Sequence, residues 1–412
     1  MKIEALPLLQ TKKEFLYLCL FLTTLFIFNL MHDYYKYKNL IVDDIFETKA
    51  IILNIYKKSN YNILKLQTND FIFYTKSNNI YLKQDLVRVL FISKYITFYQ
   101  YLKGFFAKSL FITKLEKKST FKTYLVSKID KQHSNIYIKE LFEAIFLAIP
   151  TSSDLREFFS KFAISHLIAI SGFHLSLFCL FIYYIFFAFY TPIHKKFYNH
   201  RNKKFDLLFI CVFFLFFYLV IIDFIPSFFR AFLMFVFGIL FLRSNIKILS
   251  FNTLVFTLIL IISIFPKYIF SLSLWFSIIG VFYVYLFLNY FKNLPKVVLL
   301  LFFNIWIFLA MNPVVHYFFS TTSYMQLFSF IITLGFTIFY PLLLFLHFLG
   351  FGGVFDDYLL KIFSLNINSY EVSVNFSFLV FYFLISLLSV YKKIFFIILN
   401  ILIALFFLYT YI

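Results

Sequence analysis

The 412-residue chain has few charged residues, and the two signs are unequal in number. Only 14% of residues are charged, with 38 Lys and Arg against 19 Asp and Glu. Gly and Pro number eight each. The three cysteines, Cys19, Cys179 and Cys211, lie in apolar stretches and indicate neither a disulfide framework nor a thiolate metal site. A soluble domain of this length needs more polar surface, so this composition excludes that class.

Sequence motifs of nucleotide hydrolysis and hydrolytic chemistry are also lacking. The chain contains no glycine-rich phosphate loop, no paired catalytic carboxylates and no nucleophile elbow. We therefore expect neither an ATPase motor nor a hydrolase, and the sequence calls for no cofactor.

Apolar residues are abundant, at 62% of the chain with a mean hydropathy of +0.86. This predicts a polytopic α-helical membrane protein with about nine or ten spans and a small all-β, OB-like extracytoplasmic barrel. Beyond an N-terminal apolar run at 15–31, the predicted spans are 164–190, 207–225, 228–242, 251–265, 268–290, 297–316, 324–349, 375–391 and 394–412.

The predicted organisation has five parts. Residues 1–31 form a signal-anchor helix whose N-terminus stays in the cytosol, because Lys2, Lys12 and Lys13 precede its apolar run. The basic β domain then lies outside. The parts that follow the anchor are the β domain at 32–118, a connector with interfacial helices at 119–163, a membrane core at 164–349, and an amphipathic segment with C-terminal spans at 350–412.

The β domain shows runs of β-branched and aromatic residues separated by turn-forming residues. Expected strands are 48–56, 62–68, 71–76 and 86–97. Four or five short strands suit an OB-like barrel, and an SH3-like barrel fits nearly as well.

Basic loops agree with this orientation for most of the chain. With the β domain outside, the loop holding Lys195 and Lys196, the Arg243–Lys247 pair and the Lys292–Lys296 pair all fall inside. Simple alternation fails after residue 316, because it puts Lys392 and Lys393 outside. A broken or re-entrant segment at 324–349 would restore the pattern.

One apolar span begins with a concentration of polar groups. The stretch 164–190 has no charged side chain. Nine of its first residues, 166–174, include His166, Ser171, Gly172 and His174. Polar groups in hydrocarbon tend to face protein or a wet cavity, so this is a candidate functional segment. On one helix the histidines would be about 80° apart, which disfavours a metal pair. A packing notch with hydrogen-bonded histidines is the alternative.

Arg230, near the start of another span, is a further candidate. Its guanidinium either reaches the headgroups or lines a polar path, where it could hold a phosphate. Asp223, seven residues earlier, is its expected partner.

The β domain carries basic residues among Tyr and Phe. From 32 to 140 there are 19 Lys and Arg against 9 Asp and Glu. This is typical of a groove for single-stranded nucleic acid, although a solvated face or a contact with anionic lipid fits the composition as well. The candidate DNA contacts are Lys57, Lys58, Lys65, Lys76 and Arg88, with Lys83 and Lys94 nearby.

The segment around His166 and His174 resembles the signature of the ComEC family of competence proteins. Residues 98–102 resemble the end of that family's extracytoplasmic OB domain, 227–234 its serine–arginine–alanine span, and 265–280 a later span that begins with proline. The resemblance covers about residues 40–340. One departure is Ala163, where the family usually has glycine.

The resemblance implies an inner-membrane channel that passes single-stranded DNA into the cytosol during natural transformation. It implies a periplasmic DNA receptor, a cytosolic motor or helicase and membrane lipids as partners. It leaves open whether the chain forms homo-oligomers. Longer members carry a C-terminal metallo-β-lactamase-like domain, whose His-x-His-x-Asp-His cluster is not found here. We therefore expect a short form that is not an enzyme, with any nuclease on another protein.

Two other functions remain open. One is a permease for small or lipid-linked molecules with an accessory β domain, which predicts no affinity for nucleic acid. The other is a membrane scaffold of an uptake machine, which predicts tolerance of charge changes in the core helices.

Overall fold

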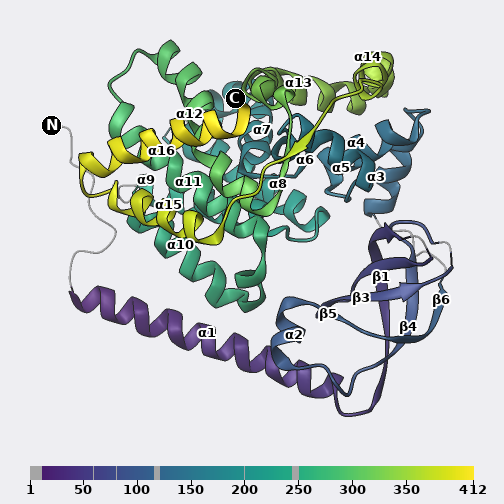
Figure 1. Cartoon of the computed structure of the whole chain (residues 1–412). Helices are drawn as coiled ribbons and strands as arrows, with labels where there is room; N and C mark the ends of the chain where they lie inside the picture. The colour runs from purple at the N-terminus through teal and green to yellow at the C-terminus, as the bar shows by residue number, and fades with distance from the viewer. Residues whose placement is uncertain (1–11, 59, 80, 116–120, 199, 244–249) are drawn as a thin grey trace.

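In the computed structural model, a bundle of long helices lies beside a small curled β-sheet (Figure 1). The structure describes residues 12–58, 60–79, 81–115, 121–198, 200–243 and 250–412. Among these residues, seven helices are long and apolar enough to cross a membrane, and three further apolar helices are shorter. The predicted class, a mostly helical polytopic chain with a small β part, is therefore confirmed in outline.

The four predicted strands are present. They are β1 (Ile45–Lys57), β2 (Asn62–Gln67), β3 (Ile72–Ser77) and β4 (Leu86–Ile92). The last ends earlier than the predicted 86–97. The reason is a helix, α2 (Phe98–Lys103), which Thr97 caps by accepting a hydrogen bond from Gln100 N.

The sheet curls because one stretch of chain pairs with both of its edges. Strand β5 (Phe105–Phe106) lies parallel to β3, and β6 (Ser109–Lys114) lies antiparallel to β4. The strand order is β5-β3-β2-β1-β4-β6. Alternate residues point inward and are fully buried, among them Ile52, Leu64, Leu66, Phe73, Val87, Val89 and Phe91.

Helix α1 (Lys12–Leu40) runs along the outside of the bundle towards the β domain (Figure 1). It extends nine residues beyond the predicted apolar run, which ended at 31. Asn29 Nδ2 donates to the carbonyl of Ser263, 2.8 Å away. Near the C-terminal end of α1, Asp33 forms an ion pair of 2.8 Å with Lys267. The Lys267 ammonium also donates a hydrogen bond to the Asp70 carbonyl in the β2–β3 turn at 2.6 Å. Lys267 thus ties α1 and the β domain to the bundle.

Short helices connect the β domain to the bundle. They are α3 (Phe121–Asp130), α4 (Ile136–Leu147), α5 (Ser153–Lys161) and α6 (Ser165–Ile168). Lys83 of the β domain pairs with Glu140 of α4 at 3.0 Å. The guanidinium of Arg156 in α5 lies 5.7 Å from the Tyr56 ring centre in β1. The connector therefore lies on the β-domain side of the bundle.

The bundle itself consists of longer helices and short one-turn segments. Its helices are α7 (Gly172–Phe197), α8 (Lys203–Ile221), α9 (Pro226–Arg243), α10 (Phe251–Ile264), α11 (Leu272–Phe291), α12 (Lys296–Phe318), α13 (Ser329–Leu349), α14 (Asp356–Phe363), α15 (Phe376–Leu388) and α16 (Lys393–Tyr411). The 3₁₀ turns η1 (Pro266–Phe270), η2 (Tyr324–Phe328) and η3 (Gly352–Phe355), and a two-stranded ribbon of β7 (Thr321–Thr322) with β8 (Tyr370–Glu371), link them.

Helix α13 contacts the connector at both of its ends. Before its first turn, Gln326 Nε2 donates to the carbonyl of Ser160 in α5 at 3.0 Å. Near its last turn, the His347 Nε2 atom lies 3.0 Å from His133 Nε2, between α3 and α4. Since α4 and α5 contact the β domain, both ends of α13 lie on the β-domain side.

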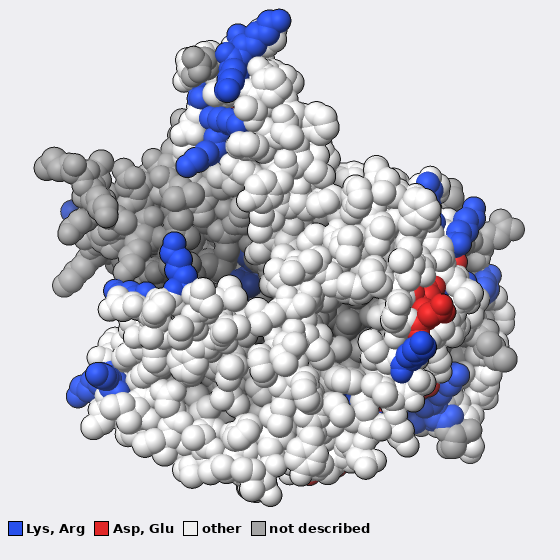
Figure 2. Space-filling model, turned by 90° about the horizontal axis from the view of Figure 1, so that it is seen from above, with Lys and Arg blue, Asp and Glu red and all other residues white. Residues whose placement is uncertain are grey.

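On the face of the bundle that is seen from above, charged side chains avoid the middle of the surface. Seen from above, Lys and Arg side chains gather towards the edges and on one projection, and the broad surface between them is uncharged (Figure 2). This distribution is typical of a membrane belt. Two lysines used in the charge argument, Lys2 and Lys247, lie outside the described residues.

Candidate functional site

The segment from His166 to His174 is not one helix, which corrects the predicted span at 164–190. Helix α6 ends at Ile168, residues 169–171 are non-helical, and α7 begins at Gly172. The angle of 80° between the two histidines, derived for a continuous helix, was therefore wrong. The break frees backbone groups beside the Ser171–Gly172 pair, as its small residues permit.

His174 stabilises the break as part of a helix cap. The Ser171 amide donates to His174 Nδ1 at 3.3 Å, and the Phe173 amide donates to Ser171 Oγ at 3.3 Å. This reciprocal arrangement is a capping box. Because Nδ1 accepts, the neutral ring carries its hydrogen on Nε2. The buried Nε2 has no hydrogen-bond partner among the described residues, and the ring lies against Phe336 and Tyr340 of α13.

His166 has a separate role from His174. Its Nδ1 lies 3.0 Å from the Ala163 carbonyl, and its Nε2 lies 3.4 Å from Thr333 Oγ1 in α13. Ala163 has a φ of 53°, in the left-handed region that favours glycine. This backbone conformation gives a physical reason why a glycine suits the position. Within the described residues, no group of three His, Cys, Asp or Glu side chains could hold a metal ion.

Arg230 is buried, with only 4% of its surface exposed. Its Nε donates to Ser277 Oγ at 2.7 Å, and its Nη1 lies 3.1 Å from Met234 Sδ. Its Nη2 faces the start of α7, 3.3 Å from where a β-carbon on Gly172 would lie. Within the described residues no carboxylate pairs with Arg230.

The predicted partnership between Arg230 and Asp223 is wrong. Asp223 instead accepts an ion pair of 2.6 Å from Lys122 of α3, and more than half of its side chain is exposed. Asp223 and Phe224 have φ angles of 58° and 51°, so the chain turns sharply between α8 and α9. The turn leaves the carboxylate at the surface, whereas Arg230 points into the bundle.

The first turns of α7 and α9 meet at this arginine. Ser227 Oγ donates to the Ile170 carbonyl at 2.8 Å, and the β-carbon of Ala231 lies 3.1 Å from where a Gly172 β-carbon would lie. Ser277 of α11 completes the contact. Three of the segments that carried the family resemblance, around 166–174, 227–234 and 271–280, are thus brought together.

A groove lies along α7 and begins at Leu175, the residue after His174. It has a volume of about 400 Å³ and runs between α7 and α9, where its lining includes Ser176, Cys179, Tyr183 and Phe235. The Ser176 hydroxyl lies one turn beyond Gly172, whose carbonyl it donates to at 3.0 Å.

The candidate DNA contacts of the β domain fall into two groups. Arg88 pairs with Glu47, and Lys94 and Lys83 each pair with a carboxylate at 3.0 Å. In contrast, Lys57, Lys58, Lys65 and Lys76 form no ion pair within the part of the chain that the structure describes.

The second group is accompanied by aromatic rings. Lys76 Nζ lies 4.6 Å from the Tyr61 ring centre, and Lys65 Nζ lies 6.0 Å from that of Tyr74. Lys65 and Tyr74 are direct partners across β2 and β3, and Tyr74 is paired in turn with the exposed Phe106 of β5. Of the five predicted DNA contacts, the four lysines are therefore without a carboxylate partner in the described part of the chain, whereas Arg88 is paired with Glu47.

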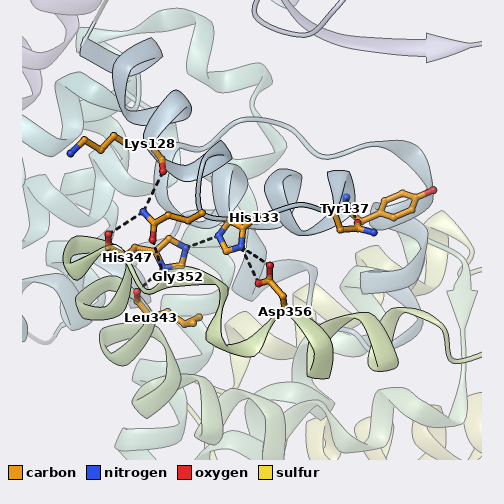
Figure 3. Close-up of polar contacts among 9 residues, drawn as sticks. Lys128, His133, Tyr137, Leu343, His347, Gly352 and Asp356 are labelled. Carbon is orange, nitrogen blue, oxygen red and sulfur yellow. Dashed lines mark hydrogen bonds and ion pairs between the residues drawn. The ribbon is translucent and has the colours of Figure 1, made fainter.

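Sequence reasoning missed a third polar cluster. His133 lies more than 200 residues before His347 and Asp356, yet it contacts both where α3–α4, α13 and α14 meet (Figure 3). Nothing in their spacing could have joined them. His133 precedes α4 and His347 lies within α13, and neither position by itself predicts the contact.

A comparison with known protein families found a match. The family model described as "Competence protein" matches residues 150–412, more than half of the chain. The chain belongs to the Competence protein family. The match begins at the connector, so it includes the break, Arg230 and the C-terminal helices but not the β domain. No curated protein and no solved structure matches the chain. The family indicates a role in DNA uptake during transformation.

Proposed function

We propose that this competence protein is a channel in the inner membrane through which single-stranded DNA enters the cytosol. The observation that carries the proposal is the buried Arg230 without a carboxylate. An unpaired buried charge costs several kcal/mol, so a site that retains one is suited to an anionic ligand. The phosphates of a DNA strand supply one negative charge per nucleotide.

The surroundings of Arg230 strengthen its preference for anions. The N-termini of α7 and α9 converge on it, and each helix N-terminus has partial positive charge and unpaired amides. Ser277 holds the guanidinium through Nε, which leaves Nη2 directed at the break. Ser171 and His174 hold that break open. We infer that His166, Ser171, Gly172, His174 and Arg230 form the entrance, and that the α7–α9 groove continues the path.

The topology we propose has α13 on the outer side instead of across the membrane. Both of its ends contact connector helices on the β-domain side, although its length and composition would suit a span. Removing one crossing returns Lys392 and Lys393 to the cytosolic side, in agreement with the positive-inside rule. With the N-terminus in the cytosol, the β domain is then extracytoplasmic.

The β domain would receive DNA before it reaches the break. Single-strand grooves combine uncompensated cations with aromatic rings on which bases stack, which Lys65, Lys76, Tyr61 and Tyr74 provide. The parallel β3–β5 pair and the curled sheet support an OB-like barrel. A periplasmic receptor would deliver the DNA, and a cytosolic motor and a separate nuclease would complete the process.

The proposal is tested by tracing labelled DNA in transformable cells. We expect Arg230→Gln to leave DNA bound outside the inner membrane while entry into the cytosol falls at least 100-fold. Arg88→Gln removes a guanidinium that is already paired with Glu47, so it is the matched control and should leave entry unchanged. Normal entry with Arg230→Gln would exclude the proposed path. If the purified chain binds small anions but no single-stranded DNA, the permease is favoured instead.

A further inference from the structure

The contact between the connector and α13–α14 has a hydrogen-bond pattern that requires one additional proton (Figure 3). His133 Nδ1 lies 2.9 and 3.0 Å from the two carboxylate oxygens of Asp356. His347 Nδ1 lies 2.7 Å from the Leu343 carbonyl. The two Nε2 atoms face each other at 3.0 Å.

The hydrogen-bond acceptors determine which ring nitrogens carry hydrogen. Carboxylate and carbonyl oxygens only accept, so both Nδ1 atoms carry hydrogen. A neutral imidazole has one N–H, and two neutral rings would therefore direct two lone pairs at each other across 3.0 Å. One more proton between the Nε2 atoms converts this repulsion into an N–H···N hydrogen bond. We propose that His133 and His347 share one proton, and that this proton fastens the connector to α13.

A metal ion in the same place fits less well. Two imidazoles that bind zinc tetrahedrally at about 2.0–2.1 Å have their nitrogens about 3.3 Å apart. The observed 3.0 Å is shorter and matches a hydrogen bond. Asp356 is bound to the far side of His133, and the described residues supply no third ligand.

The surroundings contain groups that can balance a single positive charge. The His133 side chain is fully buried, and its ring stacks on Phe142 at 4.6 Å. Phe142 and Phe146 also flank His347, at 4.4 and 4.9 Å between ring centres. Aromatic faces attract cations, and the Asp356 carboxylate balances the charge.

No other charged group contacts the pair among the described residues. Helix α4 faces it with phenylalanines, and α13 contains no Asp, Glu, Lys or Arg. From α3, the Lys128 carbonyl accepts from Gln132, while its ammonium lies over the Tyr124 ring. The titratable groups that face each imidazole are therefore the other imidazole and Asp356.

We call the His133–His347 contact between the connector and α13 the joint. Because the joint shares one proton, its stability falls when the pH is raised and when it is lowered. Loss of the proton leaves two lone pairs opposed, and gain of a second leaves two N–H groups opposed. Either change breaks the bond between α13 and the connector. Since α13 also places Phe336 and Tyr340 against His174, the joint holds the helix that covers the break.

The test follows thermal unfolding of the full-length chain in detergent from about pH 4.5 to 9, a range that includes the ordinary pKa of imidazole. His347→Gln keeps a donor and an acceptor without titrating. The difference in Tm between wild type and this variant should be bell-shaped, falling on both sides of its maximum by about 2 °C or more. The matched control, His316→Gln, alters a buried histidine whose hydrogen bonds within the described part of the chain go to Asn312 and Thr322. Its difference should show no such maximum.

A second variant changes Gly352, whose backbone lies beside His347. A β-carbon on Gly352 would lie 2.7 Å from His347 Nε2 and from Gln132 Oε1, so Gly352→Ala should abolish the maximum. A flat difference between wild type and His347→Gln would overturn the proposal. So would a wild-type Tm that falls with chelator and is restored by zinc, since a metal would then hold the histidines.

Discussion

The two halves of this protein treat positive charge differently. On the β domain, some cations are paired with carboxylates, as Arg88 is, and others are exposed to solvent, as Lys76 is. In the bundle, Arg230 is buried and none of the described carboxylates pairs with it. Exposed charges change stability little, whereas a buried unpaired charge is expensive. Under the proposed function, the cations of the β domain would attract DNA and Arg230 would select for the phosphate.

After Arg230→Gln, the strongest loss of transformation is expected from closing the space in front of Arg230. In Gly172→Ala, the new β-carbon would lie 3.3 Å from Nη2 and 3.1 Å from the Ala231 β-carbon. We expect transformation to fall at least 10-fold at unchanged surface-bound DNA. Gly335→Ala is the control, because a β-carbon there meets no atom within 4 Å. Equal counts for the two variants would show that this space is not used.

A smaller effect is expected on the β domain. The double variant Lys65→Gln with Lys76→Gln removes two uncompensated cations and should weaken single-strand binding several-fold. The slope of log affinity against log salt should decrease by about 1.4, from two lost phosphate contacts. Arg88→Gln should keep the wild-type slope. An unchanged slope in the double variant would assign the face to another ligand.

A pH effect is expected at the connector between the two halves. Burial, and then the neighbouring Asp130, raise the pKa of Glu143 from 4.5 to about 7. Between these values the folded protein binds more protons than the unfolded one, so stability falls as pH rises from 4.5 to 7. Glu143→Gln should flatten this part of the profile of Tm against pH. A profile that keeps its slope would place the titration elsewhere.

The smallest effect is expected from relieving backbone strain before the break. Ala163→Gly should raise the free energy of unfolding by up to about 1 kcal/mol, because glycine adopts positive φ without a clash. Ala169→Gly, at a position with ordinary negative φ, should not stabilise. Thermal unfolding of the two variants compares them, and equal shifts would show that the strain at 163 is negligible.

Local sequence patterns predicted the helices and strands but not the tertiary contacts between them. Alternation of apolar residues located β1 to β4, and hydropathy located most of the helices. The break at 169–171 escaped, because hydropathy ignores the capping box that Ser171 and His174 form. Arg230 was found as a candidate, yet its contact with Ser277 depends on the packing of α9 against α11. The His133–His347 contact required a tertiary fold for the same reason.

The proposed path takes the DNA strand past Arg230 and along α7. A photoreactive residue placed at Ser176, in the α7–α9 groove, should crosslink to DNA during uptake, and Arg230→Gln should abolish that product. The same probe at Val255, an exposed position on α10, should give none. Crosslinking at Ser176 that depends on Arg230 is the predicted result. Uptake of DNA without any product at Ser176 would exclude this path.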